Sequence, residues 1–309
     1  MNYPRGTRLS DWQQRDWKID NRGLESGVLT VQESLTKLKS QCAIWSDTPA
    51  LDAQVLLSYI CNKERAWVLA HPELKLTVEQ QSALNAAISR VETGEPLPYI
   101  LGQWSFYGLD FKVNAETLIP RPETELMVEN ALQWLNVHPG RRSAIDIGTG
   151  SGCIAITLAV HVPDLNITGL DISLAALEVA RINAEKHGVS ARLKFVHADL
   201  LPDNSSRYDM ICANLPYIPT KTLKGLNVFD REPTLALDGG PDGLRLIRRL
   251  LSKAANFLAS EGLVLLEIEA TQGEVASSLA GEYFPRAQIE LLPDLAGHDR
   301  LIRIETFAK

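Results

Sequence analysis

The chain has 309 residues, of which 45% are hydrophobic and 22% are charged, a composition close to the average for globular proteins. This length is enough for one large domain or two ordinary ones, so we expect a sizeable core that needs no disulfide or metal support. The 31 basic and 38 acidic residues give a formal charge of −7, which disfavours bulk binding to a nucleic-acid backbone.

Two further classes of protein are disfavoured by the sequence. No segment approaches the roughly 18–20 consecutive apolar residues of a membrane-spanning helix, and the first ten residues lack the apolar stretch of a secretory signal. The four cysteines have no C-x-x-C spacing, so neither a disulfide framework nor a zinc site is indicated. We therefore expect a cytoplasmic protein with free thiols and no metal.

The first part of the chain is predicted to be helical. Residues 1–28 have no apolar period and are interpreted as a poorly ordered extension. Capping boxes at Thr30 and Thr77, each with Glu or Gln three residues later, and the pair Thr48-Pro49 mark three helix starts. These starts predict a small all-helical domain over residues 29–93, with no convergent set of catalytic side chains.

The next segment, residues 94–115, contains apolar residues that alternate around Tyr107-Gly108. This alternation predicts a β-hairpin, which we interpret as the linker between two domains. After Pro122 the spacing of apolar residues predicts a helix with acidic residues in its first turn.

Short apolar runs alternate with helical segments through the rest of the chain, residues 116–309. The runs are Ala144–Ile147, Ile167–Leu170, Leu193–Val196, Met210–Ala213 and Leu263–Ile268. This alternation predicts a doubly wound, mostly parallel α/β sheet. Two final runs, 287–292 and 301–306, have no helix between them, so we expect one of them to run antiparallel.

The clearest local signal lies where the first of these strands turns into a helix. Its glycines allow positive φ angles and close approach of the backbone to a ligand. The third glycine comes one residue too early for a dinucleotide fingerprint, and an acid lies two residues before the first. That acid would repel a pyrophosphate but can pair with an ammonium group, which favours S-adenosylmethionine over a nicotinamide dinucleotide. The candidate cofactor-binding residues here are Asp146, Gly148, Thr149, Gly150, Ser151 and Gly152.

Two more acids end the following strands. Asp171, followed by Ile172, ends the second strand, where an acid accepts hydrogen bonds from ribose hydroxyls. Asp199, followed by Leu200, ends the third strand, near the expected position of adenine. Each acid alone could be a helix cap or a solvated loop carboxylate. Their coincidence with the glycine loop favours a cofactor site.

A second motif, Asn214-Leu215-Pro216-Tyr217, directly follows another strand of the same sheet. The Asn214 side-chain carbonyl and the Leu215 backbone carbonyl can accept hydrogen bonds from a planar NH2 group, and the Tyr217 ring can stack on it. Asn-x-Pro is also an ordinary turn sequence. Its position at a strand end favours a catalytic and substrate-binding site for an amide or an exocyclic amine, with Asn214 also next to the cofactor.

Together the two motifs resemble class I S-adenosylmethionine-dependent methyltransferases whose acceptor nitrogen is conjugated with a π system. Within these the chain resembles the HemK/PrmC family through its helical N-terminal part, the hairpin, residues 117–125 and Glu232-Pro233. The resemblance covers almost everything after residue 28. It implies a seven-stranded sheet and methyl transfer to the glutamine of the Gly-Gly-Gln motif in peptide-chain release factors. It also implies that the helical domain selects the protein partner, and that Arg121 and Glu123 belong to a substrate-binding loop over the cofactor.

One position departs from the family, which usually has Asn-Pro-Pro-Tyr where this chain has Leu215. The carbonyl acceptor is kept because every residue has one, but leucine lacks the restricted φ of proline, so we expect a less preorganised turn. The residues alone leave alternatives open. These are methylation of a ribosomal-protein glutamine, methylation of adenine N6 in a flipped base, and a non-catalytic cofactor-binding scaffold.

Overall fold

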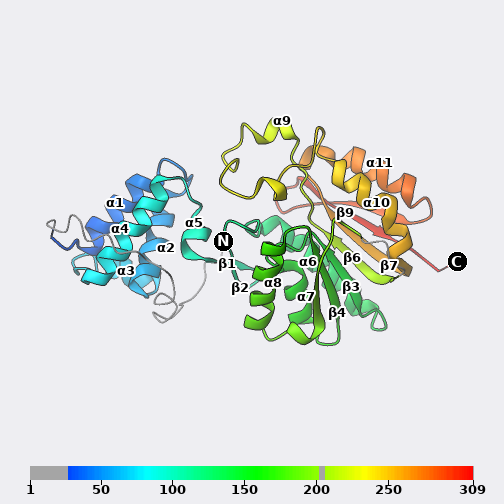
Figure 1. Ribbon diagram of the computed structural model, residues 1–309, viewed down its shortest axis with the longest axis horizontal. Helices are drawn as coiled ribbons and strands as arrows, with labels where there is room; N and C mark the ends of the chain where they lie inside the picture. The colour runs from blue at the N-terminus through cyan, green and yellow to red at the C-terminus, as the bar shows by residue number, and fades with distance from the viewer. Residues whose placement is uncertain (1–26, 202–205, 309) are drawn as a thin grey trace. The chain divides into compact units, whose positions relative to one another are not determined.

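The structure is a computed structural model that describes residues 27–201 and 206–308 (Figure 1). The predicted N-terminal extension over residues 1–28 therefore lies almost wholly outside the described residues. The chain divides into two compact units, Met1–Gln103 and Trp104–Lys309, and each is described by itself. No helix in the described part of the chain is long and apolar enough to cross a membrane.

In its described residues the first unit is built mainly from helices. They are α1 (Val31–Cys42), α2 (Pro49–Cys61), α3 (Arg65–Ala70), α4 (Val78–Glu92) and α5 (Leu97–Leu101). The three predicted starts are confirmed, and the capping boxes at Thr30 and Thr77 are both formed. Leu38, Leu56 and Leu84 from three different helices are fully buried, so the amphipathic faces meet in one core.

The segment before the hairpin differs from the prediction. The hairpin was expected from residue 94, whereas strands β1 (Gln103–Phe106) and β2 (Leu109–Lys112) begin only after helix α5. Pro98 lies in the first turn of α5, where its missing N–H removes no helical hydrogen bond. Gly102 then ends the helix with a φ of +70°.

The second unit contains one seven-stranded sheet and its covering helices. Its strands are β3 (Ser143–Ile147), β4 (Asn166–Asp171), β5 (Leu193–His197), β6 (Tyr208–Ala213), β7 (Leu258–Glu267), β8 (Gln288–Pro293) and β9 (Asp299–Glu305). Its α-helices are α6 (Glu125–Val137), α7 (Cys153–His161), α8 (Leu174–Lys186), α9 (Thr220–Leu223), α10 (Arg245–Phe257) and α11 (Gly273–Tyr283). Short 3₁₀ turns are η2 (Pro122–Thr124), η3 (Ser190–Arg192), η4 (Thr234–Ala236) and η5 (Ala270–Gln272).

The strand order is β5-β4-β3-β6-β7-β9-β8, and β9 runs antiparallel to both of its neighbours. The remaining pairs are parallel. The prediction of a doubly wound, mostly parallel sheet is therefore confirmed, as is the expectation that one of the last two strands is antiparallel.

Both faces of this sheet are buried, and alternate residues of each strand serve the two faces. In β6, Met210 and Cys212 pack in the core formed with α6 and α7, whereas Ile211 and Ala213 pack in the core formed with α10 and α11. Figure 1 shows α10 and α11 on the opposite side of the sheet from α7. Burial on both faces explains why the strands read as continuous apolar runs.

Within the second unit, a buried amide ties the hairpin to helix α8 and to the loop after β3. The Asn183 side chain of α8 accepts a hydrogen bond from the Lys112 N–H at 2.7 Å and donates to the carbonyls of Lys112 and Ser151 at 3.0 and 2.9 Å. Asn183 has no exposed surface. It therefore joins β2 to the loop that follows β3.

We expect Asn183→Ala to lower the free energy of unfolding by about 2–3 kcal/mol, because two backbone groups of the partly buried Lys112 and the carbonyl of buried Ser151 lose their partner. Chemical denaturation monitored by circular dichroism measures this loss. The control is Arg181→Ala on the same helix, which removes only an exposed pair with Glu178 and is expected to change stability by less than about 0.5 kcal/mol. Equal stability of the two variants would contradict the assigned role.

Candidate functional site

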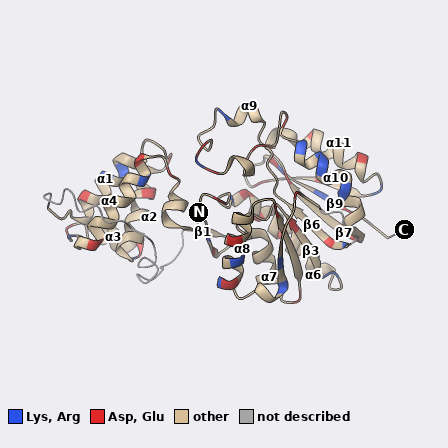
Figure 2. Cartoon of the chain, viewed as in Figure 1, with Lys and Arg blue, Asp and Glu red and all other residues tan. Residues whose placement is uncertain are grey.

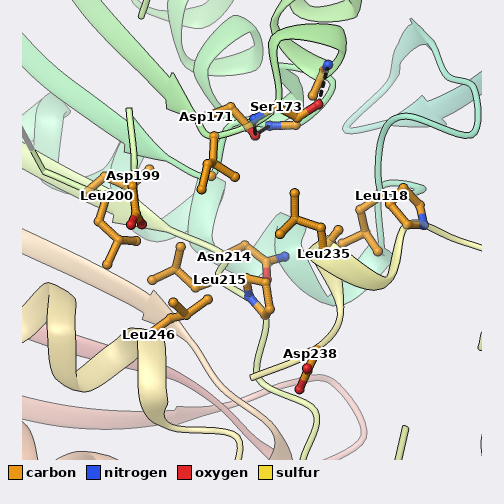
Figure 3. A pocket seen from close by; sticks show the side chains of 18 of the residues that line it. Leu118, Asp171, Ser173, Asp199, Leu200, Asn214, Leu215, Leu235, Asp238 and Leu246 are labelled. Carbon is orange, nitrogen blue, oxygen red and sulfur yellow. Dashed lines mark hydrogen bonds between the residues drawn. The ribbon is translucent and has the colours of Figure 1, made fainter. Parts of the chain in front are cut away.

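Strand register brings the predicted motifs to one edge of the sheet. Ile147 at the end of β3 pairs with Leu170 of β4 on one side and with Ala213 of β6 on the other. The residues that follow these positions line a cavity of about 620 Å³. Figure 3 shows Asp171 and Asp199 around one part of it, Leu118 and Leu235 around another, and Asn214 and Leu215 between them.

Most of the predicted site residues line this cavity. They are Gly148, Gly150, Asp171, Ile172, Asp199, Leu200, Asn214, Leu215 and Pro216. The others lie outside the lining given by the described residues; they are Arg121, Glu123, Asp146, Thr149, Ser151, Gly152 and Tyr217. The roles assigned to individual residues stay predictions.

The glycine loop approaches the cavity with its backbone. Gly148, Gly150 and Gly152 have φ angles of +74°, +55° and +81°, which glycine adopts without steric cost. The N–H groups of Gly148 and Thr149 both donate to the Leu170 carbonyl at 2.8 Å. A Cβ atom on Gly148 would lie 3.2 Å from Cδ2 of Leu215, so the loop and the second motif are closely packed.

Asp146 lies beneath this loop and is 1% exposed. Its Oδ2 accepts a hydrogen bond from the Thr149 hydroxyl at 2.6 Å. Its Oδ1 is buried without a hydrogen-bond partner among the described residues. Burial raises the pKa of Asp146 to about 7, against the lowering effect of the Thr149 hydrogen bond. The ionised carboxylate is thus held in a site that stabilises it poorly.

Asp171 is oriented by backbone groups. Its Oδ2 accepts from the Gly150 N–H and its Oδ1 from the Ser173 N–H, both at 2.8 Å. Burial raises the pKa of Asp171, and these backbone hydrogen bonds oppose the rise. Each oxygen keeps a further lone pair. The carboxylate can therefore accept two more hydrogen bonds from a ligand in the cavity.

Asp199 differs from the other two acids because it is exposed. It forms an ion pair with Arg249 of α10 at 2.9 Å, and both residues line the cavity. The next residue, Leu200, has a φ of +60°, which is unusual for a non-glycine residue. The strained conformation places an apolar side chain against the cavity, as Figure 3 shows.

The second motif presents two acceptors. Within the described part of the chain, neither Oδ1 of Asn214 nor the Leu215 carbonyl receives a hydrogen bond, whereas Nδ2 of Asn214 donates to the Thr124 hydroxyl at 3.0 Å. Tyr217 is held at both ends. Its carbonyl accepts from Nε2 of Gln272 at 2.9 Å, and its hydroxyl donates to Glu267 at 3.2 Å.

Two residues behind the motif were not predicted as site residues. Thr124 is 2% exposed and Glu267, at the end of β7, is 1% exposed. The Thr124 hydroxyl donates to Oε2 of Glu267 at 2.7 Å. Thr124 lies in the segment that carried the family resemblance, but its spacing of 143 residues from Glu267 leaves no local pattern for the pair.

The predicted loop residues are joined to another loop. Arg121 forms an ion pair with the buried carboxylate of Glu232, which also accepts a hydrogen bond from the Ile119 N–H at 3.1 Å. Residues on both sides of this link, Leu118 and Pro233, line the cavity. Glu123 lies in η2. Arg121 therefore braces the cavity wall, and its contact with substrate stays a prediction.

The raised pKa of Asp146 predicts a pH effect on stability. Because the folded-state pKa is about 7 and the ordinary value is 3.8, the protonated form favours folding, and stability falls as pH rises between about 4 and about 7. In the ligand-free protein we expect Asp146→Asn to reduce the fall in Tm between about pH 5 and about pH 8. The reduction should be at least about 2–4 °C, the shift that corresponds to 1 kcal/mol.

Thermal unfolding at the two pH values measures this difference. The control is Asp164→Asn, since Asp164 is exposed and pairs with Arg142 outside the cavity. That variant should keep the pH dependence of the parent protein. The assignment fails if Asp146→Asn keeps it as well.

Comparison with known proteins identifies the family. Residues 35–102 match the PrmC N-terminal domain, and residues 124–229 match the methyltransferase small domain. A release factor glutamine methyltransferase of Moorella thermoacetica is 43% identical over 256 residues, which cover 82% of this chain and 90% of that protein. A protein of the same name from Coxiella burnetii is 39% identical over 276 residues, 89% of this chain and 98% of that protein.

A solved structure supports the fold. The hMettl16 catalytic domain, determined in complex with the MAT2A 3′UTR hairpin 1, superimposes with a TM-score of 0.52 at 17% identity over 77% of this chain and 84% of that chain. The methyltransferase fold predicted from the strand–helix alternation, the motifs and the family resemblance is thus confirmed. Because these two relatives are 43% and 39% identical to the chain over 90% and 98% of their own length, the chain belongs to the release factor glutamine methyltransferase family.

Proposed function

We propose that this chain transfers a methyl group from S-adenosylmethionine to the side-chain amide nitrogen of the glutamine in the Gly-Gly-Gln motif of peptide-chain release factors. Membership of the family supports the reaction. The structural observation that carries the proposal is the pair of free acceptors, Oδ1 of Asn214 and the Leu215 carbonyl, in the cavity that the glycine loop also lines. A planar NH2 group has two N–H donors to match them.

The residues around the cavity fit the cofactor. Asp171 offers lone pairs on both oxygens for the ribose hydroxyls, and Gly148 and Gly150 expose backbone without side chains. The unpartnered Oδ1 of Asp146 is the acceptor proposed for the ammonium group. Ile172 and Leu200 give apolar surface for the adenine. When bound, S-adenosylmethionine supplies an electrophilic methyl group on a positively charged sulfur.

The chain's own contribution to the chemistry is positioning. An amide nitrogen is a weak nucleophile, because its lone pair is delocalised into the carbonyl. Asn214 and the Leu215 carbonyl hold its two N–H groups, and such orientation can lower a barrier by about 7–11 kcal/mol. Their oxygens also stabilise the positive charge that develops on nitrogen. The proton released from nitrogen is acidic enough for water to accept it, so we assign no general base.

The protein partner is proposed to be selected by the helical unit. Residues 35–102, which match the PrmC N-terminal domain, cover most of it. Figure 2 shows basic and acidic residues interspersed over both units, in keeping with the formal charge of −7. Such a distribution suits a protein substrate better than bulk nucleic acid. We propose the cytoplasm as the location, where release factors act.

The test is a peptide mass spectrum of a recombinant release factor incubated with this protein and S-adenosylmethionine. We expect one added methyl group on the Gly-Gly-Gln glutamine. An unmodified glutamine, with cofactor binding verified by calorimetry, would contradict the proposed acceptor; ribosomal proteins and adenine-containing oligonucleotides are then tested in turn.

Asn214→Ala should lower the rate of transfer by about 100-fold or more, because an acceptor aimed at the reacting amide is lost. Cofactor affinity should change little. The control is Asn136→Ala on α6, an exposed asparagine outside the cavity, which should leave the rate unchanged. A normal rate in Asn214→Ala would remove this residue from the site.

Gly148→Ala should weaken cofactor binding by about tenfold or more. Its new Cβ would lie in the cavity lining, 3.2 Å from Leu215 and 3.6 Å from the Asn214 carbonyl oxygen, and at a φ of +74°. Gly188→Ala is the matched control, since Gly188 has a φ of +69° but no atom within 4 Å of a Cβ. Both variants carry the same backbone strain of about 1–2 kcal/mol. A difference between their dissociation constants for the cofactor therefore reports the space that the Cβ of Gly148→Ala takes from the cavity.

A further inference from the structure

A chain of hydrogen bonds lies behind the second motif, Asn214-Leu215-Pro216-Tyr217, and joins three separate parts of the second unit. Nδ2 of Asn214 donates to the Thr124 hydroxyl at 3.0 Å, and this hydroxyl donates to Oε2 of Glu267 at 2.7 Å. The Tyr217 hydroxyl donates to the other oxygen of Glu267 at 3.2 Å. Glu267 therefore receives hydrogen bonds from residues near both ends of the motif.

The direction of this chain follows from the chemistry of its last member. An ionised carboxylate only accepts hydrogen bonds. Both hydroxyls must then point their protons at Glu267, which leaves the lone pairs of the Thr124 oxygen to receive Nδ2 of Asn214. The amide of Asn214 is consequently turned so that Oδ1 is the atom available in the cavity.

We propose that Thr124 and Glu267 are positioning residues that fix the orientation of the Asn214 amide, so that its oxygen and not its NH2 group meets the incoming substrate amide. The inference rests on the proposed function. Neither residue lines the cavity, and both act through Asn214. A substrate NH2 group needs hydrogen-bond acceptors. If the Asn214 amide were reversed, its own NH2 group would face the substrate NH2 group, and two donors cannot form a hydrogen bond.

Protonation of Glu267 would reverse the chain. A neutral carboxyl group carries an O–H that can donate to Thr124, and the Thr124 hydroxyl is then free to donate to Asn214. Asn214 would then accept this hydrogen bond through Oδ1, and its NH2 group would face the substrate. The active arrangement therefore requires the ionised form of Glu267.

The surroundings of Glu267 make this titration accessible near neutral pH. Burial raises the pKa of Glu267 to about 7, while the hydrogen bond from Thr124 and the charge of Arg300 lower it. The titratable or charged groups around it are Glu123 of η2, Tyr217, Arg300 of β9 and Cys153 of α7. Arg300 is itself paired with Asp294 at 3.2 Å.

The test compares Thr124→Val with Thr124→Ser. Valine keeps the shape but loses the hydroxyl, and serine keeps the hydroxyl. We measure kcat and KM for release-factor methylation at saturating cofactor, together with the cofactor dissociation constant and Tm. Thr124→Val should lower kcat about 10- to 100-fold, the usual cost of a misplaced catalytic group, with cofactor affinity kept. Thr124→Ser should recover most of this loss.

The pH profile is the readout that a merely structural role would not change. In the parent protein kcat should rise with pH through about 7, as Glu267 ionises. Glu267→Gln cannot ionise, so this rise should be absent from its profile. The rise should also be absent from the profile of Thr124→Val, because this variant lacks the hydroxyl that links Glu267 to Asn214.

The outcomes separate the two claims. A parent protein that binds cofactor but methylates no release factor overturns the proposed function, and this inference with it. An active parent together with a fully active Thr124→Val overturns the inference alone, as does a Thr124→Ser that is as slow as Thr124→Val. If kcat of Glu267→Gln still rises with pH through about 7, this result also overturns the inference. If Glu267→Gln fails to fold, as its Tm would show, the Thr124 pair decides.

Discussion

The site depends on the register of three parallel strands. Ile147 of β3 pairs with Leu170 and with Ala213, so the chain leaves all three strands at the same level of the sheet. Parallel strands present their carboxyl ends at one edge, where open α/β sheets bind ligands. A shift of one residue in β6 would turn every side chain of that strand to the opposite face. It would also move Asn214 away from the glycine loop.

Two carboxylates are buried beside this edge, and we propose a role in the site for each. Asp146 and Glu267 are each 1% exposed, and burial raises the pKa of each to about 7. Apolar residues of similar size would be easier to accommodate, because an ion in the core loses its hydration. Each acid instead accepts a hydrogen bond from a nearby hydroxyl, that of Thr149 in one case and that of Thr124 in the other. The ionised form of each acid is therefore disfavoured by its surroundings.

Local patterns were enough to predict most of the fold. Capping boxes at Thr30 and Thr77 and the apolar runs of the sheet depend on residues close in sequence, and the structure confirms them. The glycine loop and the Asn214 motif were found in the same way, and the structure places residues of both on one cavity. Helix α5 was missed because its five residues are too few to show a helical period.

Long-range partners could not be predicted. Glu267 lies inside the apolar run Leu263–Ile268 that predicts a strand. Nothing in that run indicates its partners, which are 143 and 50 positions away. The ion pair of Arg121 with Glu232 spans 111 positions. Such contacts are decided by strand order, which periodicity does not reveal. Asp146 is predicted to pair with a ligand, and the sequence does not indicate that its carboxylate is almost fully buried, with Oδ1 lacking a hydrogen-bond partner among the described residues.

Leu215 stands where the family usually has proline, and its side chain is only 4% exposed. A Cβ atom on Gly148 would lie 3.2 Å from Cδ2 of Leu215, so this side chain leaves little room beside the glycine loop. A shift of the Leu215 side chain toward Gly148 would therefore meet the backbone of the glycine loop. Linkage between two ligands is reciprocal, so whatever factor the substrate imposes on the affinity for cofactor, the cofactor imposes on the affinity for substrate. Because Leu215 lies so near Gly148, these two residues are where we expect such linkage to act in this chain.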